Sequence, residues 1–494
     1  MKKVIIYGFM LSSLLMGATS CESALDINQD PNYPVNASEE SLFPSAVAAS
    51  AARLGGDLQL IGSIWSQHYT QNNTSNQYKN IDSYSLNRND YNGLWSTFWS
   101  GALKDLSLTK QKAQASGKVN YYMAASILAA FDYHVLSDFY GAIPYKEGLQ
   151  AGTIPQPKWD DSKEVNKYLI IQLDEAIAKA ADAKKVASMG KIDYLFNGDI
   201  DQWVKFAKTL KLKIFMRDFN VNSAAITALL QEGDLLTIDA KMDVFADSPN
   251  KSNPLYENDR RQLNTGNNLK ASNTLLAYLK ENNDPRATAF YNLTDPSEGD
   301  NYPGGELAGL DQGDFLTEEV KGYATSIVKL AATDAVYFIS AAESAFLQAE
   351  AWVRLNDDVK AKAAYDNAVK LAFARWAHDG SSFVAAGGKY EFKPGTQDQK
   401  LELILTQKWI AATRCQAWDS FFDQGRTGIP KLSPVHFDAT GANGYVKGQW
   451  TVSVNSSLVA GEIPRRLAFP KSSSDFNPNT PTVLPINQKM WWHK

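Results

Sequence analysis

The chain has 494 residues, of which 44% are hydrophobic, 11% aromatic and 21% charged, and its formal net charge is −5. This composition predicts a globular protein with a large apolar core, and the negative charge argues against a nucleic-acid binder, which needs clustered positive charge. It has only two cysteines, Cys21 and Cys415, and beyond the N-terminus no run reaches the roughly 18 apolar residues of a membrane-spanning helix.

The N-terminus has the pattern of a bacterial secretory signal. Two lysines are followed by an almost wholly apolar run, and small residues precede Cys21. A lipoprotein signal requires a cysteine after the cleavage site, because the thiol receives the lipid. We therefore predict a signal peptide over 1–20, lipidation of Cys21 and a polar tether over 21–40. The alternative is an ordinary secreted protein with a chance cysteine.

From residue 41 the apolar residues recur at helical spacing, which predicts a mainly α-helical domain over 41–494. Two stripes with this spacing are Trp95, Phe98, Trp99, Ala102 and Leu106, and Trp203, Phe206, Ala207, Leu210 and Ile214. Further helices are predicted over 121–139 and 161–181. Trp95 and Trp99 are interpreted as core residues.

Residues 337–376 match the pattern of a tetratricopeptide helix pair. The pattern consists of Ala349, Trp352, Asn356, Ala361, Tyr365 and Ala368. Small residues at these positions allow two antiparallel helices to approach closely. One such pair cannot bury its own apolar face, so at least three pairs are expected. The helices over 121–131 and 173–181 are the second candidate pair.

Two long segments lack helical periodicity. Residues 240–335 are rich in Asn, Asp, Gly and Pro and form a predicted loop-rich insertion, since loops this long in a compact protein are usually functional or disordered. Residues 426–494 hold many prolines and form a predicted irregular tail, in which QWTVSV (449–454) is one short strand or half of a hairpin. Gly425 to Pro430 is interpreted as a helix stop.

Motifs for catalysis and metal binding are absent from the sequence, so we predict no enzyme activity and no cofactor. The five histidines form no paired ligand spacing, and there is no nucleophile elbow, phosphate loop or dinucleotide fingerprint. The Asp- and Asn-rich loops lack EF-hand spacing, which leaves a structural calcium undecided. Cys415 lies in a helix-like run and is interpreted as a buried small apolar residue.

Aromatic and amide side chains in polar loops are the remaining candidates for chemistry. Aromatic rings stack on the apolar faces of sugars, and amides hydrogen-bond to hydroxyl groups. The predicted ligand-binding residues are Trp65, Asn73, Gln77, Tyr78, Tyr84, Tyr256 and Tyr302. The alternative for each ring is a place in the core.

Seven further segments carry distinctive patterns. They are LDINQDPNYP (25–34), LSDFYGAIPYKEGL (136–149), WVKFAKTLKLKIFMR (203–217), NDPRATAFY (283–291), YFISAAESAFLQAEAWVRLN (337–356), LILTQKWIAATRCQAWDSFFDQGRTGIPKL (403–432) and EIPRRLAFPKSSSDFNPN (462–479). In this order they resemble the SusD/RagB family of nutrient-binding outer-membrane lipoproteins.

The resemblance implies a SusD-like α-helical fold, with four tetratricopeptide-like units that support a loop-rich ligand face. It also implies a lipid-anchored place on the outer surface of the outer membrane, and a SusC-like TonB-dependent transporter as partner. The implied function is non-catalytic binding of an oligosaccharide, or in some relatives an oligopeptide, before uptake. The family's glycan-binding residues fall outside the seven segments, so none is carried over.

Two functions from other classes stay open at this point. One is a lipid-anchored glycoside hydrolase on a helical scaffold, because the spacing of its two carboxylates is spatial and leaves no sequence signature. The other is an assembly scaffold whose repeat surface binds protein.

Overall fold

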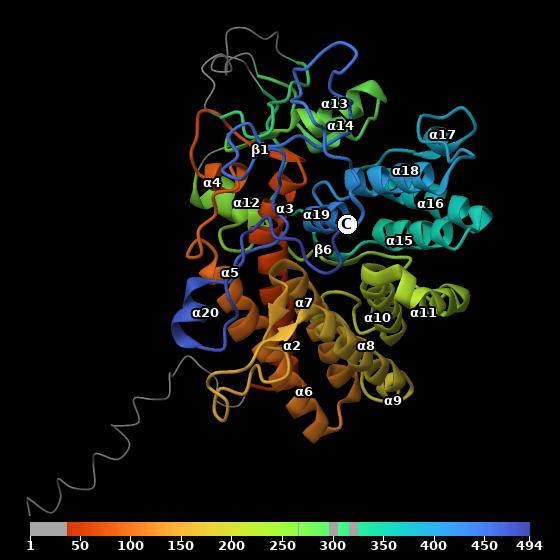
Figure 1. The fold of residues 1–494 in the computed structure, drawn as a ribbon. Helices are drawn as coiled ribbons and strands as arrows, with labels where there is room; N and C mark the ends of the chain where they lie inside the picture. Colours follow the sequence, from red (N-terminus) through yellow and green to blue (C-terminus); the bar gives the residue numbers. More distant parts are fainter. Residues whose placement is uncertain (1–36, 265, 296–304, 316–324) are drawn as a thin grey trace, which may run out of the picture.

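The computed structural model describes residues 37–264, 266–295, 305–315 and 325–494. Long helices fill the lower and right-hand parts of the molecule, and loops with short helices and β1 lie at its upper end (Figure 1). This arrangement confirms the predicted mainly α-helical fold. The predicted signal peptide over 1–20, Cys21 and Tyr302 lie outside the described residues.

The N-terminal half is built around one buried helix. The helices of this half are α2 (Glu39–Arg53), η1 (Leu54–Leu58), α3 (Gln59–Trp65), α4 (Lys79–Asp82), α5 (Asn92–Ser96), η2 (Thr97–Leu103), α6 (Lys104–Ser116), α7 (Val119–Tyr140), α8 (Ser162–Ala178), α9 (Ala180–Ala183), η3 (Gly190–Ile192), α10 (Ile200–Phe215), η4 (Met216–Asp218) and α11 (Phe219–Glu232). Nearly every residue of α7 is buried, because α2, α6, α8 and α10 all pack against it. The packing of α7 on α8 confirms the second predicted helix pair.

The C-terminal half carries the tetratricopeptide-like pair. Its helices are α12 (Pro254–Tyr256), η5 (Glu257–Gln262), α13 (Asn273–Glu281), α14 (Ala287–Phe290), α15 (Ala341–Arg354), α16 (Asp358–Ala374), α17 (Ser381–Val384), α18 (Gln397–Ala411), α19 (Ala417–Thr427) and α20 (Lys471–Phe476). Helices α15 and α16 pack against each other, with Ala349, Ala361, Tyr365 and Ala368 fully buried between them and their neighbours. The predicted pair is therefore confirmed.

The strands are short and pair over long distances in sequence. They are β1 (Tyr69–Gln71), β2 (Ala142–Ile143), β3 (Asp160–Asp161), β4 (Ala240–Met242), β5 (Leu269–Ala271) and β6 (Val336–Ile339). The antiparallel pairs are β1–β5, β2–β3 and β4–β6. The loop-rich insertion predicted over 240–335 thus begins with a strand and contains another, together with several short helices.

The C-terminal tail is irregular apart from α20, as predicted. The strand expected at QWTVSV is reduced to a single bridge between Leu432 and Trp450. Gly428 ends α19 in the left-handed conformation, with a φ of 73°, which confirms the predicted helix stop. Cys415 is buried, as predicted, and burial raises the pKa of its thiol to about 12.

A network of buried ion pairs joins the long helices. The Arg426 side chain of α19 donates to both carboxylate oxygens of Glu350 on α15, at 2.6 and 2.7 Å, and to Asp423 at 2.8 Å. Lys408 of α18 lies 2.8 Å from Asp423. Although burial alone would raise the pKa of Glu350, the guanidinium groups of Arg426 and Arg354 lower it to about 2. Glu350 is therefore ionised throughout the physiological pH range.

The same network extends to α7 and α10. Lys213 of α10 lies 2.9 Å from Glu343 of α15 and 2.5 Å from Asp419 of α19. Arg217 lies 2.6 Å from Asp138 of α7. All five side chains are at most 5% exposed. Helices that are distant in sequence are thus joined by charges that water does not reach.

We expect Arg426→Met to destabilise the protein by about 3–5 kcal/mol, because Glu350 and Asp423 would remain buried without their counter-charge. The exposed pair of Lys431 and Glu402, 2.7 Å apart, offers a control, since Lys431→Met should cost less than about 1 kcal/mol. Urea denaturation at pH 7 measures both values. An equal loss in the free energy of unfolding for the two variants would contradict a structural role for the network.

A second prediction concerns Asp132 of α7, whose carboxyl is fully buried and accepts one hydrogen bond, from Ser50 at 2.7 Å. Burial raises the pKa of Asp132 from its ordinary 3.8 to about 8. Between pH 4 and 8 the folded state therefore holds a proton that the unfolded state releases, so this group makes the free energy of unfolding fall as pH rises.

We expect Asp132→Asn to weaken this decline and to make the protein more stable than the wild type at pH 8, by more than about 1 kcal/mol. Denaturation at pH 5 and pH 8 measures the difference. The exposed Asp398→Asn serves as the control and should leave the pH dependence unchanged. A parallel pH dependence of the Asp132→Asn variant and the wild type would rule out a buried, protonated carboxyl.

Candidate ligand-binding face

The upper end of the molecule is assembled from three distant parts of the chain (Figure 1). Strand β1 pairs with β5, with Tyr69 opposite Ala271 and Gln71 opposite Leu269. The backbone of Val454 donates to the carbonyl of Gln312 at 2.9 Å, and that of Ser457 donates to the carbonyl of Ser83 at 2.8 Å. We call this surface, formed by residues 66–93, 253–264, 266–295, 305–315 and 432–461, the loop face.

Asp82 is the buried centre of the loop face. Its Oδ2 accepts hydrogen bonds from the Thr70 hydroxyl and the Gln71 backbone N–H, both at 2.7 Å, and its Oδ1 accepts from the Gln312 amide at 2.5 Å. The Gly313 N–H donates to the Thr70 hydroxyl at 3.1 Å. Burial raises the pKa of Asp82 to about 6, although these donors act in the opposite direction. The carboxyl of Asp82, at the end of α4, thus joins β1 to the segment 310–315.

Gly313 allows the C-terminal segment to close over this centre. Its φ is 72°, and a Cβ at this position would overlap the hydroxyl of Ser453. A residue with a side chain would therefore suffer both backbone strain and a steric clash. The absence of a side chain at Gly313 lets residues 452–457 lie directly against the segment 310–315.

Tyr78 and Tyr256 come from two segments that meet at Asp259. The Tyr78 hydroxyl donates to the Asp259 carboxylate at 2.8 Å, and the Asn268 amide donates to the same oxygen at 2.9 Å. Tyr78 is 8% exposed, so its ring lies just beneath the accessible surface. The ring of Tyr256, three residues before Asp259, is half-buried and lies 5.5 Å from the Arg261 guanidinium.

The other predicted ligand residues lie at different depths. Trp65 and Tyr84 are each 2% exposed, and the Trp65 indole donates to the carbonyl of Ile81 at 3.1 Å. These two rings present no face to solvent in this structure. Asn73 is half-buried and Gln77 is exposed, both in the loop between β1 and α4. Of the predicted set, Asn73, Gln77 and Tyr256 are accessible to a ligand.

A hollow of about 510 Å³ lies on the loop face between two C-terminal segments. It is lined by Leu432, Ser433, Pro434, Val435, His436, Val452, Ser453, Val454, Ser456, Leu458, Ala460 and Gly461. The Ser457 hydroxyl donates to the carbonyl of Tyr84 at 2.9 Å, so the wall of the hollow rests on the Tyr84 backbone. Apolar walls with hydroxyl, imidazole and backbone groups suit a ligand with mixed polar and apolar faces.

Sequence analysis missed two aromatic residues of the loop face. The rings of Phe437 and Tyr445 lie 5.1 Å apart, both half-buried, on the loop that follows His436. The criterion applied to residues 65–91, aromatic rings in a polar loop, also selects this pair. Nothing in the sequence, however, indicates that residues 432–461 meet residues 66–84.

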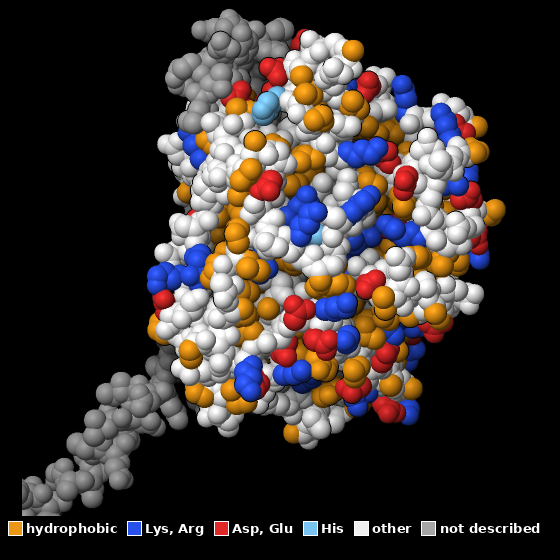
Figure 2. All heavy atoms as spheres, viewed as in Figure 1, with side chains coloured by type: hydrophobic (Ala, Val, Ile, Leu, Met, Phe, Trp, Pro, Cys, Tyr) orange, Lys and Arg blue, Asp and Glu red, His pale blue; other side chains and the backbone are white. Residues whose placement is uncertain are grey.

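Figure 2 shows how the types of side chain are distributed over the loop face. Hydrophobic side chains are scattered there among uncharged polar atoms, whereas Lys and Arg gather in the middle of the same view (Figure 2). Within the described residues, no group of three or more His, Cys, Asp and Glu could hold a metal ion. In the same part of the chain, no helix is long and apolar enough to span a membrane.

Comparison with known proteins identifies relatives with the same architecture. Residues 31–448 match the model of the SusD-like family, which is described as starch-binding and associating with the outer membrane. Curated proteins give no match.

Solved structures share the fold over nearly the whole chain. A SusD homolog from Bacteroides uniformis is 22% identical, covers 92% of this chain and 99% of its own, and has a TM-score of 0.73. A chitin-binding SusD homolog from Flavobacterium johnsoniae is 20% identical over 92% and 98% of the two chains, with a TM-score of 0.72. A SusD/RagB family protein from Bacteroides thetaiotaomicron is 21% identical over 92% and 99%, with a TM-score of 0.67.

We expect Asp82→Ala to destabilise the protein by about 1–3 kcal/mol, because three buried donors lose their acceptor. The amide hydrogens of Gln71 and Gly313 should exchange faster with solvent, while those of α7 should be less affected. Hydrogen-exchange mass spectrometry measures this difference. Asp438→Ala, which removes an exposed carboxylate of the same face, is the control, and equal exchange in both variants would show that Asp82 does not organise the loop face.

Proposed function

Because the chain belongs to the SusD-like family, described as starch-binding and associating with the outer membrane, we propose that it is a non-catalytic surface protein that binds a glycan on its loop face. The observation that carries this proposal is the hollow between residues 432–436 and 452–461, together with the Phe437 and Tyr445 rings on the loop that follows its wall residue His436. The chitin-binding relative from Flavobacterium johnsoniae supports an oligosaccharide as the ligand class.

The chemistry of the loop face matches the proposed ligand. Aromatic rings stack on the apolar face of a sugar, and half-buried rings such as Tyr256 contribute area at little entropy cost. The buried ties through Asp82 and Asp259 hold the surrounding loops before a ligand arrives, which lowers the entropy cost of binding.

The proposal also covers the place and the partner of the protein. A lipid on Cys21, followed by the polar segment 21–40, would hold the folded domain at the outer membrane. A SusC-like TonB-dependent transporter would receive the ligand. Modest affinity would suit this role, since a ligand that is passed on must also leave its first site.

The proposal is tested by glycan binding to the protein without residues 1–21, whose removal leaves the described domain intact. Isothermal titration with maltoheptaose and chitohexaose measures binding, and mass spectrometry of the native protein reports lipid on Cys21. Affinity purification from outer membranes would recover a TonB-dependent barrel. Binding of oligopeptides but not of glycans would overturn the glycan assignment, and hydrolysis of either sugar would overturn the non-catalytic one.

We expect Tyr256→Ala and Tyr445→Ala each to weaken glycan binding by roughly tenfold or less, because a stacking ring contributes about 1 kcal/mol. Phe476 on α20 is 78% exposed and lies outside the segments that line the hollow, so Phe476→Ala is the matched control and should leave the affinity unchanged. Unchanged affinity in both tyrosine variants would remove these rings from the binding site.

A further inference from the structure

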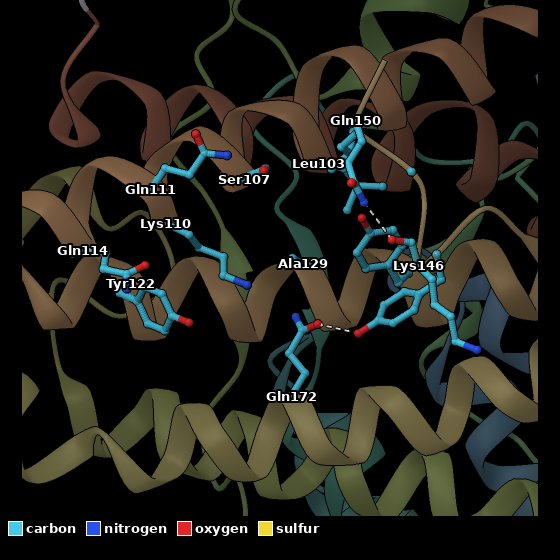
Figure 3. Close-up of a pocket in the computed structure, with 14 residues that line it drawn as sticks. Leu103, Ser107, Lys110, Gln111, Gln114, Tyr122, Ala129, Lys146, Gln150 and Gln172 are labelled. Carbon is cyan, nitrogen blue, oxygen red and sulfur yellow. Dashed lines mark hydrogen bonds between the residues drawn. The ribbon is translucent and has the colours of Figure 1, made fainter. Parts of the chain in front are cut away.

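A second cavity, of about 430 Å³, lies at the helical end of the molecule (Figure 3). Its walls come from α6, α7, α8 and the segment 145–150 that follows β2. In Figure 1 these helices lie at the lower end and the loop face at the upper end. The volume falls within the range of about 300–1,000 Å³ typical of small-molecule sites.

One cation points into this cavity. Lys110 of α6 extends from the helix towards the middle of the open space (Figure 3). Among the residues described, no carboxylate forms an ion pair with Lys110, and its ammonium lies 5.5 Å from the Tyr122 ring. Burial lowers the pKa of Lys110, and the charge of Glu175 offsets this only in part. The cavity thus presents a positive charge that no protein group neutralises at close range.

The second lysine of the cavity is different. Lys146 lies 3.4 Å from Asp160 and 4.4 Å from the Tyr168 ring, and its side chain is directed away from the centre of the cavity (Figure 3). The charge of Lys146 is therefore already paired with the Asp160 carboxylate. Lys110 is the lysine of this cavity that can meet an anionic group of a ligand.

The remaining walls carry aromatic rings and amides in fixed positions. The Tyr145 hydroxyl donates to the Gln172 side chain at 2.8 Å, and Gln172 in turn donates to the carbonyl of Ser126 at 2.6 Å. The rings of Tyr133 and Tyr145 meet edge to face, 4.9 Å apart. Gln111 and Gln114 of α6 contribute further amides, both exposed at the rim.

From this combination we propose that the cavity between α6, α7 and α8 binds a saccharide that carries a carboxylate, with Lys110 pairing with the acid and the glutamines with the hydroxyl groups. The amides and tyrosine rings distinguish this ligand from a bare inorganic anion, which would use only the charge. The walls offer one unmatched cation and several side-chain amides, so most of their binding groups suit hydroxyl groups, which favours an acidic sugar over an acidic peptide. This site is separate from the loop face and does not depend on the function proposed for it.

The test uses digalacturonate as the acidic probe and digalactose as its neutral counterpart, titrated into the protein without residues 1–21. We expect digalacturonate to bind more tightly, and its binding to weaken as salt rises, because the Lys110 charge is only partly shielded. Lys110→Met should weaken digalacturonate binding at least tenfold. Lys104→Met changes an exposed residue of the same helix outside the cavity and should have no effect.

Three outcomes would overturn the proposal. These are no binding of digalacturonate by the wild type, equal binding by the Lys110→Met variant, and tighter binding of a diglutamate peptide than of digalacturonate. Tyr256→Ala, on the loop face, should leave digalacturonate binding intact, so failure of this site and failure of the proposed function can be told apart. Thermal unfolding of each variant confirms that a loss of binding does not reflect a loss of fold.

Discussion

The arrangement of the long helices depends on one requirement, that the charges buried between α10, α15, α18 and α19 meet opposite charges from neighbouring helices. Arg426 of α19 meets Glu350 of α15, and Lys213 of α10 lies between Glu343 and Asp419. Hydrophobic burial is non-directional, whereas a buried ion without its partner costs several kcal/mol. We infer that the ion pairs select one relative placement of these helices, and that apolar packing supplies most of the free energy that holds them there.

Buried polar groups also hold the loop face together, although here they are single carboxyl groups that accept several hydrogen bonds rather than ion pairs. Segments that are far apart in sequence are joined by single buried carboxyl groups, Asp82 for β1 and residues 310–315, and Asp259 for Tyr78 and Asn268. Each carboxyl accepts several donors that no water reaches. The helical half therefore acts as a fixed support, and the loops that contact a ligand keep their shape without long strands.

Local patterns predicted the helices well and the ligand surface less completely. The spacing of Ala349, Trp352, Ala361 and Tyr365 indicated a helix pair because periodicity reports which face of a helix is buried. It could not show whether the rings of Trp65 and Tyr84, placed between polar residues, lie outside or inside, because that depends on residues hundreds of positions away. The tie between Tyr78 and Asp259 spans 181 positions and leaves no trace in either local sequence.

The path of the first helices has a mechanical consequence. Helices α2, η1 and α3 follow one another without a break from Glu39, next to the N-terminal segment, to Trp65, beneath the loop face (Figure 1). These three helices share one path through the interior, with no hinge between them. A displacement of Glu39 relative to the rest of the domain would therefore be passed along this path to Trp65 rather than absorbed by a flexible linker.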